Sequence, residues 1–189
     1  MDENASILAL TDRARCGDKD ALNKLVGLLE PSVVRAVRLI VGSGSSIAED
    51  AAQEAMLDVA RSIGSLRDPA ALHVWAARIA TRRAIKVARR ERLFGLVRLP
   101  RSRDGVTAEP QNSSAALKEA FDELPPRLRA TTVLRLYLGF SEAETAEALG
   151  CSVGTVKSNL HDARARLSEA LQSRGATPMV VNTVKESRP

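Results

Sequence analysis

The sequence has few of the residues that would support a β-sheet, disulfide-bonded or metal-binding protein. Aromatic residues occupy only 3% of its 189 positions, with a single Trp and a single Tyr. Strands favour aromatic and β-branched side chains, so this composition favours small helical bundles. The two cysteines, Cys16 and Cys151, lie far apart and form neither a disulfide framework nor a metal quartet, which fits a reducing cytoplasm.

Other absences exclude whole classes of function. The N-terminus, MDENASILAL, is acidic and has no basic segment followed by a long apolar run, and no apolar run in the chain could cross a bilayer. His73 and His161 are isolated from cysteines and carboxylates at ligand or triad spacing, and there is no glycine-rich phosphate loop. The sequence therefore predicts no enzyme, no cofactor or metal, no small-molecule substrate and no membrane insertion.

Charge is distributed unevenly along the chain. The formal net charge is +5, but residues 67–103 carry 11 Lys and Arg against 2 Asp and Glu, a net charge of +9. Residues 1–66 have a net charge of −3 (7 against 10), and residues 104–189 have a net charge of −1 (10 against 11). Residues 67–103 thus have the charge expected of a surface that binds a polyanion. A basic helix that only faces solvent would have the same net charge.

Apolar residues recur at three- and four-residue steps through most of the chain, which predicts an all-α protein. The expected helices cover about residues 7–14, 19–41, 46–62, 69–93, 115–123, 127–138, 141–149 and 152–173. Pro31 lies inside the second pattern and either kinks that helix or, as the preferred alternative, begins a new one, because proline is tolerated in a first turn. Ser46 and Glu49 have the spacing of a capping box.

One internal segment has no periodicity. Residues 94–114 contain Pro100, Gly105 and Pro110 among small polar residues, which predicts a flexible linker. The expected fold is therefore two small helical domains, residues 1–93 and 115–173, joined by this linker. Residues 174–189 show no pattern and are expected to form a disordered tail.

The second domain contains the pattern of a helix-turn-helix. Ser141 and Glu144 form a capping box that begins one helix, and Gly150 ends it at a position that needs a left-handed backbone. Ser152 caps the next helix. The inward stripe of that helix consists of Val156, Leu160, Ala163 and Leu167.

The rest of this last helix has side chains that can reach base edges in a major groove. A recognition helix presents its N-terminal residues there, where Thr, Ser, Asn and Lys all form hydrogen bonds. The candidate DNA-binding positions are Ser152, Gly154, Thr155, Lys157, Ser158, Asn159, His161 and Arg164. A plain αα-hairpin without DNA binding is the alternative.

Residues 124–171 resemble region 4 of the extracytoplasmic function (ECF) sigma factors of bacterial RNA polymerase. The opening Leu124–Arg127 (LPPR) and the string Val153–Ser158 (VGTVKS) carry the resemblance. In that family region 4 reads the −35 promoter element, so the resemblance implies this role for the candidate positions and for Arg127. Response-regulator DNA-binding domains share the fold but usually lack the Leu-Pro-Pro opening.

The first domain contains an acidic helix that resembles part of region 2 of the same family. Ala48–Glu54 (AEDAAQE) is similar to the helix that ends in a Gln-Glu pair and docks on the coiled coil of the largest polymerase subunit. The resemblance assigns polymerase binding to Glu49, Asp50, Gln53 and Glu54. Taken alone, the segment would be better explained as a solvated acidic face that complements the helix dipole.

The basic segment Val74–Arg92 resembles the part of region 2 that recognises and opens the −10 element. Phosphate contacts there supply affinity and salt dependence but little sequence information. The resemblance places such contacts at Arg78, Arg82, Arg83, Lys86, Arg89 and Arg90. Arg67 and Asp68 lie in the loop that captures a flipped base in the family. Trp75 either lies beside the melted strand or simply fills the core.

The resemblance extends over about residues 18–173, with departures. Met56 and Ala60 stand where the family often has aromatic residues, and Lys86 stands where it often has aspartate. Asn159 and Asp162 replace arginines that are common in the recognition helix. We therefore expect fewer phosphate contacts at the −35 element than other family members make. A larger share of the promoter affinity should then come from the first domain and from polymerase.

The sequence thus predicts a cytoplasmic sigma factor that binds core RNA polymerase and promoter DNA, with an anti-sigma factor as a further expected partner. Two alternatives belong to other classes. A sigma mimic would bind only an anti-sigma factor, but such proteins usually carry a receiver domain and lose basic residues. A plain helix-turn-helix regulator would need neither the Gln-Glu helix nor the basic helix.

Overall fold

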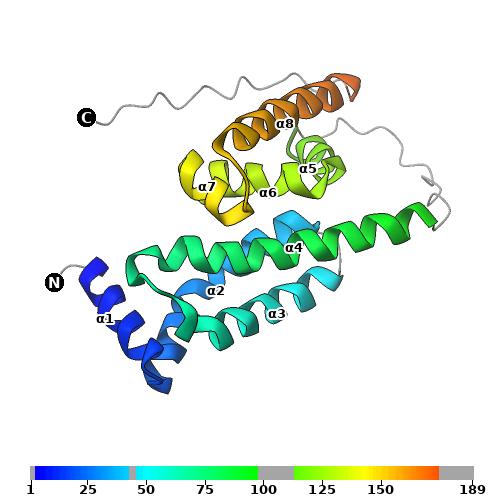
Figure 1. Cartoon of the computed structure of the whole chain (residues 1–189). Coiled ribbons are helices and arrows are strands. Elements are labelled where there is room, and N and C mark those ends of the chain that lie inside the picture. Colours follow the sequence, from blue (N-terminus) through cyan, green and yellow to red (C-terminus); the bar gives the residue numbers. More distant parts are fainter. Residues whose placement is uncertain (1–2, 43–45, 98–112, 175–189) are drawn as a thin grey trace.

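The computed structural model describes residues 3–42, 46–97 and 113–174, and the regular elements of this part of the chain are all helical (Figure 1). The first half consists of α1 (Glu3–Arg15), α2 (Lys19–Val41), α3 (Ser46–Ser62), two 3₁₀ turns, η1 (Ile63–Ser65) and η2 (Pro69–Ala71), and α4 (Leu72–Val97). The second half consists of α5 (Ser113–Glu123), α6 (Pro126–Thr132), the π-helical η3 (Val133–Tyr137), α7 (Glu142–Leu149) and α8 (Val153–Ser173). The expected all-α fold is confirmed, while most of the predicted linker and tail lies outside the described residues.

The first half forms a bundle of α2, α3 and α4, with α1 packed against α2. Helix α2 buries one or two residues per turn along a single stripe, which includes Leu25, Leu29, Val33 and Ile40. Helix α3 faces this stripe with small residues such as Ala51 and Ala55. Small side chains let helices approach closely, so the bundle needs few aromatic residues.

Pro31 does not begin a new helix, contrary to the preferred expectation. Helix α2 continues through it from Lys19 to Val41. Proline removes one backbone hydrogen bond and disfavours the helix locally. The buried stripe on both sides of Pro31 outweighs this loss, because each large apolar side chain removed from water contributes about 1.5–3 kcal/mol. Pro31 itself lies on the exposed side of the helix.

Helix α4 begins and ends slightly differently from the prediction. Asp68 accepts a hydrogen bond from the Ala70 N–H at 2.9 Å and caps the short 3₁₀ turn η2, from which α4 continues at Leu72. The helix then runs to Val97, four residues beyond the expected end at Leu93. Residues 94–97, expected as the beginning of the linker, are therefore helical, since no proline interrupts the backbone before Pro100.

The helix-turn-helix forms as its local signals predict. Ser141 and Glu144 make both hydrogen bonds of the capping box at the beginning of α7. Gly150 has φ 62°, in the left-handed region, and Ser152 caps α8 by accepting from the Thr155 N–H at 3.1 Å. The inward stripe of α8 is buried as expected, with Leu167 partly buried. The π-helical turn η3 before α7 was not predicted.

The two halves share one hydrophobic core. Within the first bundle, α4 faces the second domain and packs against both α7 and α6 (Figure 1). Ala130, Leu134 and Leu149 of the second domain belong to the same buried cluster as the stripe of α2. The guanidinium of Arg35 on α2 also lies 5.1 Å from the centre of the Tyr137 ring. The sequence pattern did not predict this packing between the two halves.

Candidate promoter and polymerase interfaces

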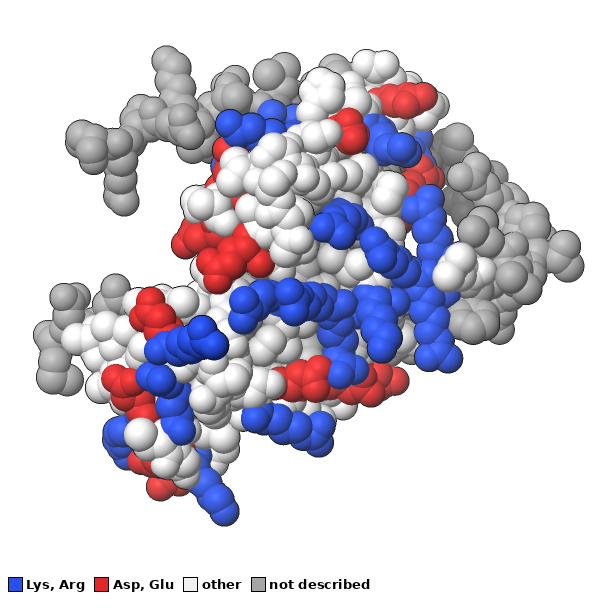
Figure 2. All heavy atoms as spheres, in the orientation of Figure 1, with Lys and Arg blue, Asp and Glu red and all other residues white. Residues whose placement is uncertain are grey.

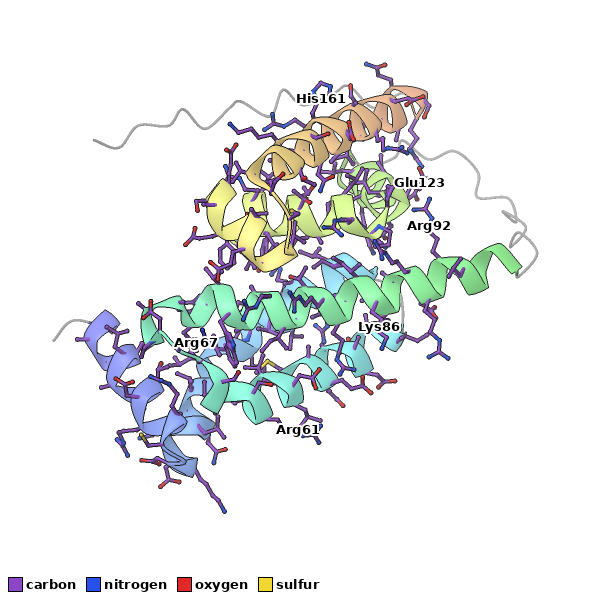
Figure 3. The ribbon with its side chains drawn as sticks, in the orientation of Figure 1. Arg61, Arg67, Lys86, Arg92, Glu123 and His161 are labelled. Atoms are coloured by element: carbon purple, nitrogen blue, oxygen red, sulfur yellow. The ribbon has the colours of Figure 1, made fainter. Side chains whose placement is uncertain are left out.

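The recognition helix α8 keeps much of its candidate DNA-binding surface exposed. Gly154, Ser158, His161 and Arg164 are exposed, and His161 points away from α4 on the outer side of the molecule (Figure 3). Lys157 is also largely exposed, with its Nζ 3.4 Å from a Glu142 carboxylate oxygen on α7. This surface is therefore open to DNA even while the two domains pack together.

Four other candidate positions of the second domain make contacts inside the protein. Ser152 and Thr155 are joined by the cap of α8. The Asn159 side-chain amide points inward and donates to the Thr131 hydroxyl at 3.1 Å. Arg127 is half-buried and donates to the Leu149 carbonyl at 3.5 Å, at the end of α7. Asn159 and Arg127 thus connect helices within the second domain, and the more exposed candidate positions are the ones open to DNA.

The capping box of α7 gives a testable pH dependence. Hydrogen bonds from the side chain and backbone of Ser141 hold the pKa of Glu144 below its ordinary value. A carboxylate with a lowered folded-state pKa stabilises the protein above its unfolded pKa, and that contribution is lost as pH falls through the folded value. Ser141→Ala is expected to lower the free energy of unfolding by about 1 kcal/mol at neutral pH. Denaturant titrations at several pH values should show this difference shrinking below about pH 4.

Ser158→Ala is a suitable control, because Ser158 is exposed in the interior of α8 and caps no helix. It should change the unfolding free energy by less than about 0.5 kcal/mol at every pH, as surface substitutions usually do. A Ser141→Ala difference that stays constant from neutral to acidic pH would contradict the role assigned to Glu144.

Basic side chains gather along α4, across the middle of the molecule (Figure 2). Arg82, Lys86 and Arg89 are exposed on this helix, Arg90 is exposed as well, and Arg78 is half-buried. Spacings of three and four residues place Arg82, Lys86 and Arg89 on one side of the helix. Such a row can follow the phosphates of one DNA strand.

One end of this basic row lies beneath the second domain. A Cβ atom added at Gly150, just after α7, would lie 3.6 Å from Nη2 of Arg82. The last carbonyls of α7 carry a partial negative charge, so Arg82 has a favourable neighbour there. In this arrangement α7 restricts access to part of the candidate DNA-binding surface of α4.

The remaining candidate contacts to the −10 element lie partly on the surface and partly in the core. Arg67 and Asp68 are exposed in the turn before α4, and the Asp68 carboxylate caps η2. Trp75 is only 5% exposed and packs in the shared core. An aromatic side chain that stacks beside a melted strand needs an accessible face, so this placement favours the interpretation that Trp75 fills the core.

The candidate polymerase-docking residues line the exposed side of α3. Glu49, Asp50, Gln53 and Glu54 are all exposed. The Glu49 carboxylate accepts from Arg38 of α2 at 2.6 Å. Glu54 pairs with Arg83, which the sequence had placed on the DNA side of α4. Two of the four candidate docking residues are therefore ion-paired to neighbouring helices of the same bundle. The sequence also predicted a capping box between Ser46 and Glu49. The Ser46 side chain lies outside the part of the chain that the structure describes.

Arg129 is a residue that sequence reasoning missed. Its side chain is only 7% exposed and lies at the end of α2, where a Cβ atom added at Gly42 would be 3.6 Å from its Nη1. Nη1 donates to the Asp122 carbonyl at 3.4 Å, while the buried Nε has no hydrogen-bond partner among the described residues. Burial lowers the pKa of Arg129 from its ordinary value. Nothing in its local sequence indicates this burial, because the cover comes from the other domain.

Two further features of the described residues bear on function. None of their helices has the length and apolarity needed to cross a bilayer. They also contain no group of three or more His, Cys, Asp or Glu side chains arranged to hold a metal ion.

Comparison with known families gives the class of this protein. Residues 25–94 match the family described as Sigma-70 region 2, and residues 114–167 match the one described as Sigma-70, region 4. The first range contains α3 and most of α4, and the second contains the helix-turn-helix. The two halves of the shared core thus correspond to two successive sigma-factor regions.

Curated relatives narrow this class. The ECF RNA polymerase sigma-E factor of Escherichia coli (strain K12) is 31% identical over 193 residues, covering 91% of this chain and 97% of the relative. The ECF RNA polymerase sigma factor SigE of Mycolicibacterium smegmatis is 32% identical over 166 residues, covering 82% of this chain but 64% of that longer relative. The chain belongs to the extracytoplasmic function family of RNA polymerase sigma factors, as the sequence resemblance predicted.

Solved structures share the fold. CnrH in complex with the cytosolic domain of CnrY has a TM-score of 0.65 at 23% identity, covering 88% of this chain and 97% of that one. The sigma factor RpoE in complex with the anti-sigma factor NepR from Bartonella quintana has a TM-score of 0.63 at 21% identity, covering 79% and 96%. Both confirm the all-α architecture described above.

Proposed function

We propose that this protein binds core RNA polymerase, directs it to a promoter and opens the DNA there, without chemistry of its own. The observation that carries the proposal is the combination, in one sigma-family chain, of an acidic helix and a basic helix packed side by side with a separate helix-turn-helix. In this proposal α3 docks on polymerase, α4 holds the −10 element, and α8 reads the −35 element. A regulator with only a helix-turn-helix would use neither α3 nor α4.

The charges of these helices fit the three assigned partners. Exposed carboxylates on α3 can pair with basic residues of polymerase, and the exposed cations of α4 can bind phosphates in exchange for counterions. The exposed row on α8 includes Lys157, Ser158 and His161, which can form hydrogen bonds to bases or phosphates. Asn159 is turned inward, so only a small number of α8 side chains remain to recognise the bases of the −35 element.

Run-off transcription tests the proposal directly. The full chain is mixed with bacterial core RNA polymerase and a library of promoter fragments, and the transcripts are sequenced. We expect products from a subset of promoters that core polymerase alone does not use. A library that yields no product dependent on this protein, with a known ECF factor active in parallel, would refute the proposal.

The proposal includes a place of action and a regulating partner. Action on polymerase at a promoter places the protein in the bacterial cytoplasm. The similar RpoE structure is a complex with an anti-sigma factor, and we propose that a protein of the same kind regulates this chain. A partner that bound across both domains would hold together the arrangement in which α7 covers part of α4.

A further inference from the structure

Arg83 differs from the other cations of α4 in the direction of its side chain. Its Nε donates to the Asp58 carboxylate of α3 at 2.7 Å, and its Nη2 bonds to the same oxygen. Its Nη1 bonds to the Glu54 carboxylate. The Arg83 side chain is only 31% exposed, whereas Arg82, the residue before it, and Lys86, three residues after it, are both exposed. One guanidinium thus bridges two carboxylates of the next helix.

The positions of these two carboxylates suit such a bridge. Glu54 and Asp58 are four residues apart, so they lie one above the other on the same side of α3. The planar guanidinium has five N–H donors in a fixed fork and can bind two carboxylates at once, which an ammonium cannot do with the same geometry. The bridge therefore fixes both the rotamer of Glu54 and the position of α3 against α4.

We propose that Arg83 is a positioning residue for polymerase docking rather than a phosphate contact. This proposal rests on the function proposed above, in which Glu54 is one of the docking residues. Arg83 holds Glu54 in one orientation and prevents repulsion between Glu54 and Asp58. Asp58 shares this role, although it lies beyond the segment that resembles the docking motif. The pair of Arg38 with Glu49, at 2.6 Å, holds the other end of the docking segment in a similar way.

The proposed effect concerns binding geometry more than stability. Partly exposed ion pairs contribute little to folding, because solvent screens them and holding long side chains in place costs entropy. Loss of a pre-oriented carboxylate has a larger effect on docking, since a mobile Glu54 must be ordered again when polymerase binds. Asp58→Asn keeps the size of the side chain and replaces its carboxylate by a neutral amide, so it tests this effect with little disturbance of packing.

The experiment measures two quantities on the full-length chain. The first is the affinity for core RNA polymerase, from fluorescence titration of labelled protein. The second is the salt dependence of promoter binding by the assembled holoenzyme, at saturating sigma and on a fragment selected by run-off transcription. Arg83→Ala and Asp58→Asn are each expected to weaken polymerase binding about threefold to tenfold, which is the cost of ordering one long side chain on binding. Neither should change the salt slope of DNA binding.

Arg82→Ala is the matched comparison, since it removes the same side chain one position earlier on the same helix. It should leave polymerase binding unchanged and reduce the salt slope by about 1, the loss of one phosphate contact. The double variant Arg83→Asp with Asp58→Arg exchanges the two charges. It should bind polymerase more tightly than the single variants do, which a merely unfolded protein could not. Thermal unfolding of each variant checks that the bundle remains folded.

Two results would overturn the proposal. One is a salt slope of promoter binding that Arg83→Ala reduces as much as Arg82→Ala does. This result would show that Arg83 contacts a DNA phosphate. The other is normal polymerase affinity for a folded Asp58→Asn. Failure of the wild-type chain to bind core polymerase would instead refute the proposed function itself, and it would be seen before any variant is compared.

Discussion

Replacing Arg82, Lys86 and Arg89 together by alanine is expected to weaken promoter binding by the holoenzyme about 100-fold at ~0.15 M salt. All three side chains are exposed on one side of α4. Each phosphate contact changes the logarithmic salt slope by about 0.9 in duplex DNA, so three contacts should reduce the slope by roughly 2.7. Binding titrations from low to moderate salt measure both quantities. The loss should be similar on every promoter sequence, because phosphate contacts carry no base information.

A control triple variant separates this effect from a general change in charge. Lys19, Lys24 and Arg61 are exposed on α2 and α3, and their replacement by alanine removes the same net charge. The control should bind promoter DNA nearly as wild type does, with an unchanged slope. A control that weakens binding as strongly as the α4 variant would show that net charge, and no defined phosphate row, governs the affinity.

Separation of the two domains on promoter binding is the second large expected effect. The −10 and −35 elements are centred about 25 base pairs apart, or roughly 85 Å at 3.4 Å per step. A compact chain of this length has a radius of gyration of only about 16 Å. Helix α4 itself, with 26 residues, is about 39 Å long. The arrangement in which α7 packs on α4 therefore cannot place one domain on each element, and we expect the shared core to open.

Energy transfer between two dyes can measure this opening. Cysteines introduced at Arg61 on α3 and Gln172 on α8, both exposed, carry the dyes after Cys16 and Cys151 are replaced by serine and alanine. Transfer should be efficient in the free protein and nearly lost in the holoenzyme bound to a promoter. A second pair, at Lys24 and Arg61 within the first bundle, should keep its transfer in both states. High transfer from the first pair in the promoter complex would contradict the opening.

The interface between the two domains leaves one buried polar group without a hydrogen-bond partner in the described part of the chain, and this makes separation of the domains easier. Arg129 is buried between the domains with one N–H left without a partner among the described residues, and such a group costs free energy. The apolar contacts of Leu134 and Leu149 favour the closed arrangement. The two effects oppose one another, so polymerase and DNA need to supply less free energy to separate the domains than a fully satisfied interface would require.

Local signals predicted much of the secondary structure and the helix-turn-helix. Capping at Ser141 and Ser152 and the left-handed position at Gly150 act within a few residues of the chain, and all three are present in the structure. Pro31 shows the limit of such signals. Its own preference favours a helix start, but burial of a stripe that extends over both sides of it keeps α2 continuous.

The sequence alone determined the class of this protein: an all-α chain with a net-positive basic helix, an acidic helix and a DNA-reading hairpin, each encoded by residues close together. The packing of the helices, in contrast, sets which side chains remain available to partners. It turned Arg83 toward Asp58, Asn159 toward Thr131 and Trp75 into the core. These choices depend on which helices pack together, and helical spacing gives the side of a helix on which a residue lies but not its neighbour. The contact between α4 and α7 has the same origin, since it joins segments separated by more than forty residues.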